Sequence, residues 1–160
     1  MREAVIVSTA RTPIGKAYRG AFNETEAPAL GGHVVKHAVE RAGVDPSEID
    51  DVMLGLAAPQ GTQGYNIGRL SAIAAGLPIT VPGLQMDRMC SSGLMTIGYA
   101  AKSIMCNEQD IVVAGGLESF SLVQNKYKNS YRAASEPVTE LHHRLDMGSK
   151  ETVRRVAAGY

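Results

Sequence analysis

The sequence predicts a layered α/β domain in which four strands alternate with three helices, in the order βαβαβαβ. Three observations support this expectation. Short apolar runs rich in β-branched residues recur up to residue 114, and segments with apolar residues at helical spacing separate them. The last run, at residues 110–114, is continuously apolar after Asp110, as strands buried on both faces are. We therefore expect a mixed or parallel sheet packed against helices.

The first half of this pattern ends at residue 57. Residues 4–8 form a short β-branched run and are the predicted first strand. Apolar side chains at helical spacing predict a helix over residues 26–42, which Gly43 ends. The sequence Asp-Pro-Ser-Glu at 45–48 predicts a turn or a single helical turn, and a second strand follows at 52–57.

The second half begins with a loop at 61–64 and a helix at 66–75, which Gly76 and a nearby proline end. A third strand is predicted at 81–86. The helix predicted at 91–106 consists mostly of small or apolar residues around its whole circumference. Such a helix is typical of a buried layer.

The composition changes after the fourth strand. Residues 1–121 contain all the predicted elements and form one α/β domain. Residues 122–160 are mainly polar and basic and have no clear strand pattern. We interpret them as the incomplete start of a separate, loop-rich segment.

The charge balance argues against several classes of partner. The 160 residues contain 16 Lys+Arg and 16 Asp+Glu, which leaves no basic surface for nucleic acid and no polybasic membrane anchor. The uncharged stretch at 70–86 contains two prolines, and the apolar residues after Glu3 are too few for a secretory signal. We expect a soluble cytoplasmic protein without nucleic-acid or membrane partners; an organelle form whose presequence has been removed stays open.

Cys90 lies between the third predicted strand and the first turn of the predicted buried helix. Backbone N–H groups at a helix N-terminus carry positive partial charge and lack intrahelical partners. They stabilise a thiolate, the reactive form of cysteine, and are suited to hold an oxyanion. Position alone leaves two interpretations open, a nucleophile or a small buried apolar residue.

Several motifs around Cys90 distinguish these interpretations, and they follow one another in a specific order and spacing. They are Arg-Thr-Pro-Ile-Gly at 11–15, Arg69, Ala-Gly-Leu-Pro at 75–78, Cys-Ser-Ser-Gly-Leu at 90–94, and the strand with Gly-Gly-Leu-Glu-Ser at 110–119. Over residues 1–121 the chain resembles the N-terminal part of the thiolase family, the acetyl-CoA acetyltransferases and 3-ketoacyl-CoA thiolases. The Gly-Gly-Leu-Glu-Ser motif favours thiolases over the related β-ketoacyl synthases.

The resemblance implies a thiolase-like fold whose C-terminal half is missing, and an acyltransferase of fatty acid metabolism. Cys90 would accept an acyl group from acyl-CoA as a thioester, with its own N–H as an oxyanion donor. Acetyl-CoA would then condense with the thioester, or coenzyme A would cleave a 3-ketoacyl-CoA in reverse. Coenzyme A thioesters are the implied substrates, no cofactor is tightly bound, and the implied assembly is a homodimer or homotetramer.

The chain also departs from the family pattern. Asp87 stands where the family usually has Asn, and we expect Arg88 to neutralise a carboxylate that would otherwise oppose a thiolate. The family's two bases, a His in Gly-His-Pro and a Cys in Cys-Gly-Gly-Gly, do not occur in these 160 residues. The chain alone is therefore expected not to catalyse. A non-catalytic truncated chain, or a half-domain that acts only with a partner, is the alternative, and no coenzyme A contacts are assigned.

The remaining candidate residues favour structural roles. His142, His143 and Asp146 lie in a polar segment, and His33 and His37 share one helix face without a third ligand, so we predict no metal site. A small basic and aromatic cluster between residues 126 and 132 is most simply a solvated loop; a subunit contact and a contact with the phosphates of coenzyme A are the alternatives. Cys106 ends the predicted buried helix and is expected to be a core residue, too far from Cys90 for a disulfide.

Overall fold

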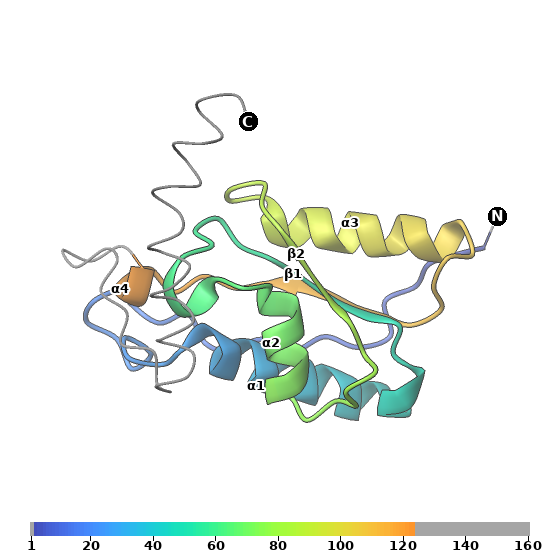
Figure 1. The fold of residues 1–160 in the computed structure, drawn as a ribbon, viewed down its shortest axis with the longest axis horizontal. Coiled ribbons are helices and arrows are strands. Elements are labelled where there is room, and N and C mark those ends of the chain that lie inside the picture. Colours follow the sequence, from blue (N-terminus) through green and yellow to red (C-terminus); the bar gives the residue numbers. More distant parts are fainter. Residues whose placement is uncertain (1, 124–160) are drawn as a thin grey trace, which may run out of the picture. The chain divides into compact units, whose positions relative to one another are not determined.

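The fold comes from a computed structural model that describes residues 2–123. Its central sheet has three strands, β1 (Asp51–Gly55), β2 (Gly83–Met86) and β3 (Val112–Gly116), in the order β2-β1-β3. Two helices, α1 (Ala27–Ala42) and α2 (Ile67–Ala74), lie on one face of this sheet, and α3 (Ser92–Met105) lies on the other (Figure 1). The α/β fold class and the layered arrangement predicted from the sequence are confirmed.

Both strand pairs are parallel, with Val52 opposite Gly83 on one side of β1 and Val113 on the other. The chain leaves β1, crosses one face through α2 to reach β2, and then crosses the other face through α3 to reach β3. The connections that follow the neighbouring strands β1 and β2 therefore leave the sheet toward opposite faces. In open α/β sheets, ligands bind beside such a switch point, at the carboxyl ends of the strands.

Local signals set the helix boundaries much as the sequence predicts. Gly43 follows α1 with a left-handed φ of 67°, and its N–H donates to the carbonyl groups of Val39 and Glu40. The side chain of Asn66 caps α2 by accepting from the Arg69 N–H at 3.2 Å. Asn107, after α3, also has a left-handed φ, 61°. Short 3-10 turns, η1 (Pro46–Glu48) and η2 (Gly61–Gln63), occupy the predicted turn and loop, and a one-turn helix α4 (Phe120–Val123) ends the described region.

The main apolar core lies between the sheet and the α1/α2 layer. Its members are almost fully buried and come from both helices, from β1 and from the adjoining loops: Ala27, Val35, Val39, Ile49, Val52, Leu54, Leu56, Ile67, Ala72 and Val81. Gly68 permits this packing, because a Cβ there would lie 2.3 Å from the Leu84 carbonyl oxygen and 2.4 Å from that of Val52.

Within residues 2–123, α3 is buried on the face toward the sheet and exposed on the other, so the expectation of a buried helix holds for one face. Its inner face carries Ser92, Thr96, Ala100 and Ser103, which pack toward the sheet. Leu94 on another face is 75% exposed. The apolar composition indicated burial, but the sheet covers only one side of the helix.

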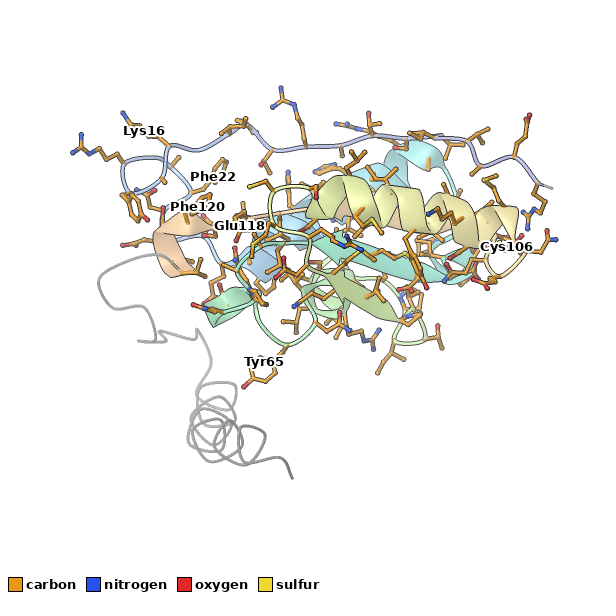
Figure 2. The ribbon with its side chains drawn as sticks, turned by 90° about the horizontal axis from the view of Figure 1, so that it is seen from above. Lys16, Phe22, Tyr65, Cys106, Glu118 and Phe120 are labelled. Carbon is orange, nitrogen blue, oxygen red and sulfur yellow. The ribbon has the colours of Figure 1, made fainter. Side chains whose placement is uncertain are left out.

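The predicted first strand is also not observed. Residues 2–16 contain no regular secondary structure, and Val5, Ile6 and Val7 are each more than 70% exposed. This segment runs along the domain from the Cys106 end toward Phe22 (Figure 2). An ion pair between Arg2 and Asp110 and a 2.9 Å hydrogen bond from Arg41 Nη1 to the Thr9 carbonyl hold it. The β-branched run favours a strand, but a strand also has to pair with the edge of a sheet. This segment does not pair with β2 or β3, the edge strands of the sheet.

The outer elements show two further differences. The strand predicted at 110–114 begins two residues later, as β3 (Val112–Gly116), because Asp110 N–H and Ile111 N–H donate to the Asp50 carboxylate instead. The segment predicted at 122–160 lies almost wholly outside the described residues, so the boundary at residue 121 stays a prediction. No helix in residues 2–123 is long and apolar enough to cross a membrane.

Candidate active site

Cys90 lies in the short connection between the end of β2 and the start of α3. It is exposed and its thiol is free. Because β2 is parallel to β1, this connection leaves the sheet at the carboxyl ends of the strands, beside the switch point in strand order. The predicted location of Cys90, at a helix N-terminus with open access, is confirmed.

The residue before Cys90 has an unusual backbone conformation. Met89 has a φ of 52°, in the left-handed region that non-glycine residues seldom adopt, at a cost of about 1 kcal/mol or more. Its N–H donates to Oδ1 of Asp87 at 2.8 Å, and its carbonyl accepts from the Ser92 N–H at 3.1 Å. The Asp87 carboxylate thus stabilises the turn. The sequence suggested only that its charge would act on the Cys90 thiol.

Arg88 is not the partner that the sequence suggested for Asp87. Within residues 2–123 the structure has no ion pair between them, and the Asp87 carboxylate binds the Met89 N–H instead. The Arg88 backbone serves the same turn, because its carbonyl accepts from both the N–H and the hydroxyl of Ser91, at 3.2 and 2.8 Å.

Ser92, the first residue of α3, links this turn to the sheet. Its hydroxyl oxygen accepts from the Arg88 N–H at 2.7 Å and lies 2.6 Å from the Met89 carbonyl and 3.2 Å from that of Leu56. Leu56 directly follows β1, and its N–H donates to the carbonyl of Met86 at the end of β2. Ser92, which is only 2% exposed, therefore joins the Cys90 turn to the residue that follows β1.

Three glycines bring the start of α3 against the strand ends. A Cβ on Gly55 would lie 2.3 Å from the Ser92 carbonyl carbon, and one on Gly116 would lie 3.0 Å from Cα of Gly93. Real Cβ atoms do not approach backbone this closely, so only glycine fits at Gly55. The sequence marked Gly93 and Gly116 within motifs, but it offered no signal for Gly55.

A second polar cluster lies beyond the same strand ends. Gln63 is fully buried, and its Nε2 donates to Oε1 of Glu118 at 2.6 Å and to the Ala58 carbonyl at 2.8 Å. Its Oε1 accepts from the Ser119 N–H. The other carboxylate oxygen of Glu118 accepts from the Ala57 N–H at 2.7 Å. These bonds join the loop after β1 to the loop after β3, next to the start of α3.

Arg69, another motif residue, acts on the backbone. Its guanidinium donates to the carbonyl of Ile79 at 2.9 Å and to that of Val81. The side chain therefore fixes the loop that leads into β2, whose far end carries Cys90. Arg69 positions a strand and does not approach the thiol itself.

The other titratable residues singled out from the sequence lie elsewhere. His33 and His37 are on α1, on the opposite face of the sheet from α3; their rings meet at 4.5 Å, and His37 Nδ1 lies 3.4 Å from Glu40. Within residues 2–123, no group of three candidate ligands suits a metal ion. The candidates at 142, 143 and 146, and those between 126 and 132, lie outside the described residues.

Cys106 corrects another prediction, because it is an exposed residue after α3 and not a core residue. Figure 2 shows it at the opposite end of the domain from Glu118. The 14 residues of α3 separate it from the Cys90 turn by about 20 Å of helix. The expectation that the two thiols are independent agrees with this geometry.

An exposed thiol at a helix N-terminus, above parallel strand ends, matches the arrangement that the motifs suggested. The family model described as "Thiolase, N-terminal domain" matches residues 4–160. The chain belongs to the thiolase family. It is 48% identical over 123 residues to a 3-ketoacyl-CoA thiolase of Bacillus subtilis, and 45% identical over 121 residues to an acetyl-CoA acetyltransferase of Cupriavidus necator. These alignments cover 77% and 76% of this chain.

Solved thiolase structures share the fold as well. The chain superimposes on the crystal structure of the Bacillus anthracis acetyl-CoA acetyltransferase with a TM-score of 0.72 and 41% identity, over 76% of its own length. It spans only 30% of that chain, and 32% and 30% of the Bacillus subtilis and Cupriavidus necator thiolases. The activity of a whole thiolase is therefore a proposal for this chain.

Proposed function

We propose that this chain supplies the nucleophilic half of an acyl-CoA C-acyltransferase, with Cys90 as the acyl acceptor. The observation that carries the proposal is the exposed Cys90 thiol at the start of α3, on a turn that follows β2 and is joined through Ser92 to the residue after β1. A nucleophile needs both solvent access and a fixed direction of attack. Membership of the thiolase family supports the same assignment.

In the first half-reaction, Sγ of Cys90 adds as a thiolate to the carbonyl carbon of acyl-CoA. The tetrahedral intermediate places its negative charge on the carbonyl oxygen, beside the N–H groups at the start of α3. Collapse breaks the bond to the coenzyme A sulfur and leaves an acyl thioester on Cys90. The proton lost from Cys90 is transferred to the released coenzyme A thiolate.

In the second half-reaction, the α-carbon of acetyl-CoA loses a proton and attacks the Cys90 thioester. A carbon–carbon bond forms, the bond to Sγ breaks, and 3-ketoacyl-CoA leaves. This step requires a base that removes a proton next to a thioester carbonyl. The histidines of the described region lie on α1, on the other face of the sheet, so we assign the bases to groups outside residues 2–123.

Mass spectrometry of the acylated protein tests this function. In a complete enzyme that contains this chain, incubation with acetyl-CoA is expected to leave one acetyl group on the tryptic peptide that contains Cys90. Cys106→Ala is the matched control and should acquire the acetyl group as the original chain does, whereas Cys90→Ala should not. Acetyl transfer that persists in Cys90→Ala, or that occurs mainly on Cys106, would contradict the proposal.

Three accompanying properties belong to the same proposal. We expect acyl-CoA and acetyl-CoA to bind as substrates, with no tightly held cofactor. We also expect a cytoplasmic protein that assembles as a homodimer or homotetramer, through a two-fold interface. Light scattering tests the assembly, and a well-folded monomer at high protein concentration would argue against it.

A further inference from the structure

We propose that Ser92 is the positioning residue of the Cys90 turn. Its hydroxyl holds the turn in the conformation that directs the thiol outward. The inference rests on the proposed role of Cys90 and assigns Ser92 no contact with substrate. Ser92 lies two residues after Cys90 and is almost fully buried.

The hydrogen bonds of Ser92 close a ring around Cys90. Its Oγ accepts from the Arg88 N–H at 2.7 Å, on the chain before Cys90, and lies within donor distance of the Met89 carbonyl at 2.6 Å. The Ser92 hydroxyl therefore binds the backbone on the N-terminal side of Cys90, and Cys90 lies inside the ring that these bonds close. A hydroxyl accepts and donates at the same time, so alanine at this position leaves the Arg88 N–H without its partner.

The hydrogen bonds of this ring also offset the conformational cost of the left-handed Met89 backbone. Met89 is left-handed, and a non-glycine residue stays there only if its surroundings hold it. Met89 is held on both sides: its carbonyl accepts from the N–H and the hydroxyl of Ser92, and its N–H donates to the Asp87 carboxylate. Without the hydroxyl, the turn is free to relax toward a common conformation, which would redirect Sγ.

Ser92 also ties the turn to the sheet. The Leu56 carbonyl, directly after β1, lies 3.2 Å from Oγ, and Gly55 fits against the Ser92 backbone only because it lacks a side chain. The neighbouring Ser91 has none of these links. It is exposed, and its hydroxyl makes one 2.8 Å bond to the Arg88 carbonyl. Ser91 is therefore a matched control of the same residue type in the same turn.

Competitive alkylation tests this inference without requiring acyl transfer. Iodoacetamide labels Cys90 and Cys106 in one sample, and trypsin places them in separate peptides, because Arg88 and Lys102 flank the Cys90 segment. Ser92→Ala should lower the ratio of the Cys90 rate to the Cys106 rate by roughly fivefold, the size of a lost helix-terminus interaction. Ser91→Ala should change this ratio less than twofold, and Ser92→Thr, which keeps the hydroxyl, should retain it.

A second readout reports on the hydrogen bond itself. The Arg88 amide should exchange with solvent roughly fivefold faster in Ser92→Ala than in Ser91→Ala. An unchanged labelling ratio and unchanged Arg88 exchange in folded Ser92→Ala would overturn the inference. If circular dichroism shows that this variant does not fold, Ser92→Thr decides. Loss of the Cys90 preference in folded Ser92→Thr overturns the inference, and retention supports it.

The outcomes separate this inference from the proposed function. If Cys90 accepts no acetyl group but its alkylation depends on Ser92, the function fails and the positioning role stands. If Cys90 is acetylated, and the ratio of the Cys90 to the Cys106 alkylation rate in Ser92→Ala equals that of the original chain, the function stands and the positioning role fails. In an assembled enzyme, Ser92→Ala should lower kcat with little change in KM, because it displaces the nucleophile and removes no substrate contact.

Discussion

Gln63 and Glu118 join two loops that are 55 residues apart in the sequence, through a 2.6 Å hydrogen bond from Nε2 to Oε1. The same carboxylate receives the Ala57 N–H, and the same amide group receives the Ser119 N–H. The cluster thereby closes the carboxyl end of the sheet beside the turn that carries Cys90. Its bonds are the basis of the first prediction.

Glu118→Ala should lower the free energy of unfolding by about 2 kcal/mol, because it leaves the Ala57 N–H without its partner and removes one of the two acceptors of the buried Gln63 Nε2 group. Urea denaturation followed by circular dichroism measures the change. Glu108→Ala, on the exposed turn after α3, is the control and should stay within about 0.5 kcal/mol of the original chain. Equal effects of the two substitutions would show that the cluster contributes little.

Gly55→Ala should be severely destabilising, by about 3 kcal/mol or more, because its Cβ would lie 2.3 Å from the Ser92 carbonyl carbon. Relief requires α3 and the Cys90 turn to move away from β1. The control is Gly98→Ala, in the middle of α3, where no atom lies within 4 Å of the added Cβ. It should stabilise the chain by up to about 1 kcal/mol through helix propensity. Thermal melts distinguish the two, and a tolerated Gly55→Ala would argue against the close packing.

The stability of the fold should depend on pH through Asp51, at the start of β1. Partial burial raises the pKa of its carboxyl above the ordinary value of 3.8, and its Oδ1 is buried without a partner among the described residues. A raised pKa means that Asp51 stabilises the fold most when it is protonated in both states. That contribution is complete below the unfolded pKa and is lost as pH rises through the folded pKa.

Asp51→Asn should therefore unfold at higher urea concentration than the original chain at pH 7, and the difference should shrink as pH falls toward 3.8. Asp50→Asn is the contrasting variant. The Asp50 carboxylate accepts from the N–H groups of Asp110 and Ile111, at 2.6 and 3.0 Å, so its replacement should destabilise the chain. A destabilised Asp51→Asn at pH 7 would contradict the assigned cause of the shift.

Residues 1–160 alone should not turn over acetoacetyl-CoA with coenzyme A. The described residues place no histidine beside Cys90, and Cys106 is beyond the far end of α3. The measurement is a thiolysis assay on material whose intact mass confirms this sequence. Turnover above background that disappears in Cys90→Ala would refute the prediction and would require a base among the 160 residues.

Signals within a few neighbouring residues were enough to predict much of this protein. Gly43 and Gly76 mark helix ends, and both have a left-handed φ, because helix termination depends on residues within one turn of each other. The position of Cys90 between a strand and a helix follows from the same short-range patterns. The motifs at 11–15, 75–78, 90–94 and 110–119 were sufficient to indicate the thiolase family, which the family model confirms.

Tertiary structure alone decided which strands are neighbours and which side chains meet at their ends. The order β2-β1-β3, the bond between Gln63 and Glu118, and the approach of Gly55 to Ser92 all join residues far apart in the chain. The sequence likewise did not show which side chains of α3 are buried. Ala100 faces the sheet and Leu94 faces solvent, although both are apolar. Hydrophobicity and propensity are properties of a local segment, whereas a strand edge, a buried hydroxyl or a close backbone contact exists only when a second segment lies against it.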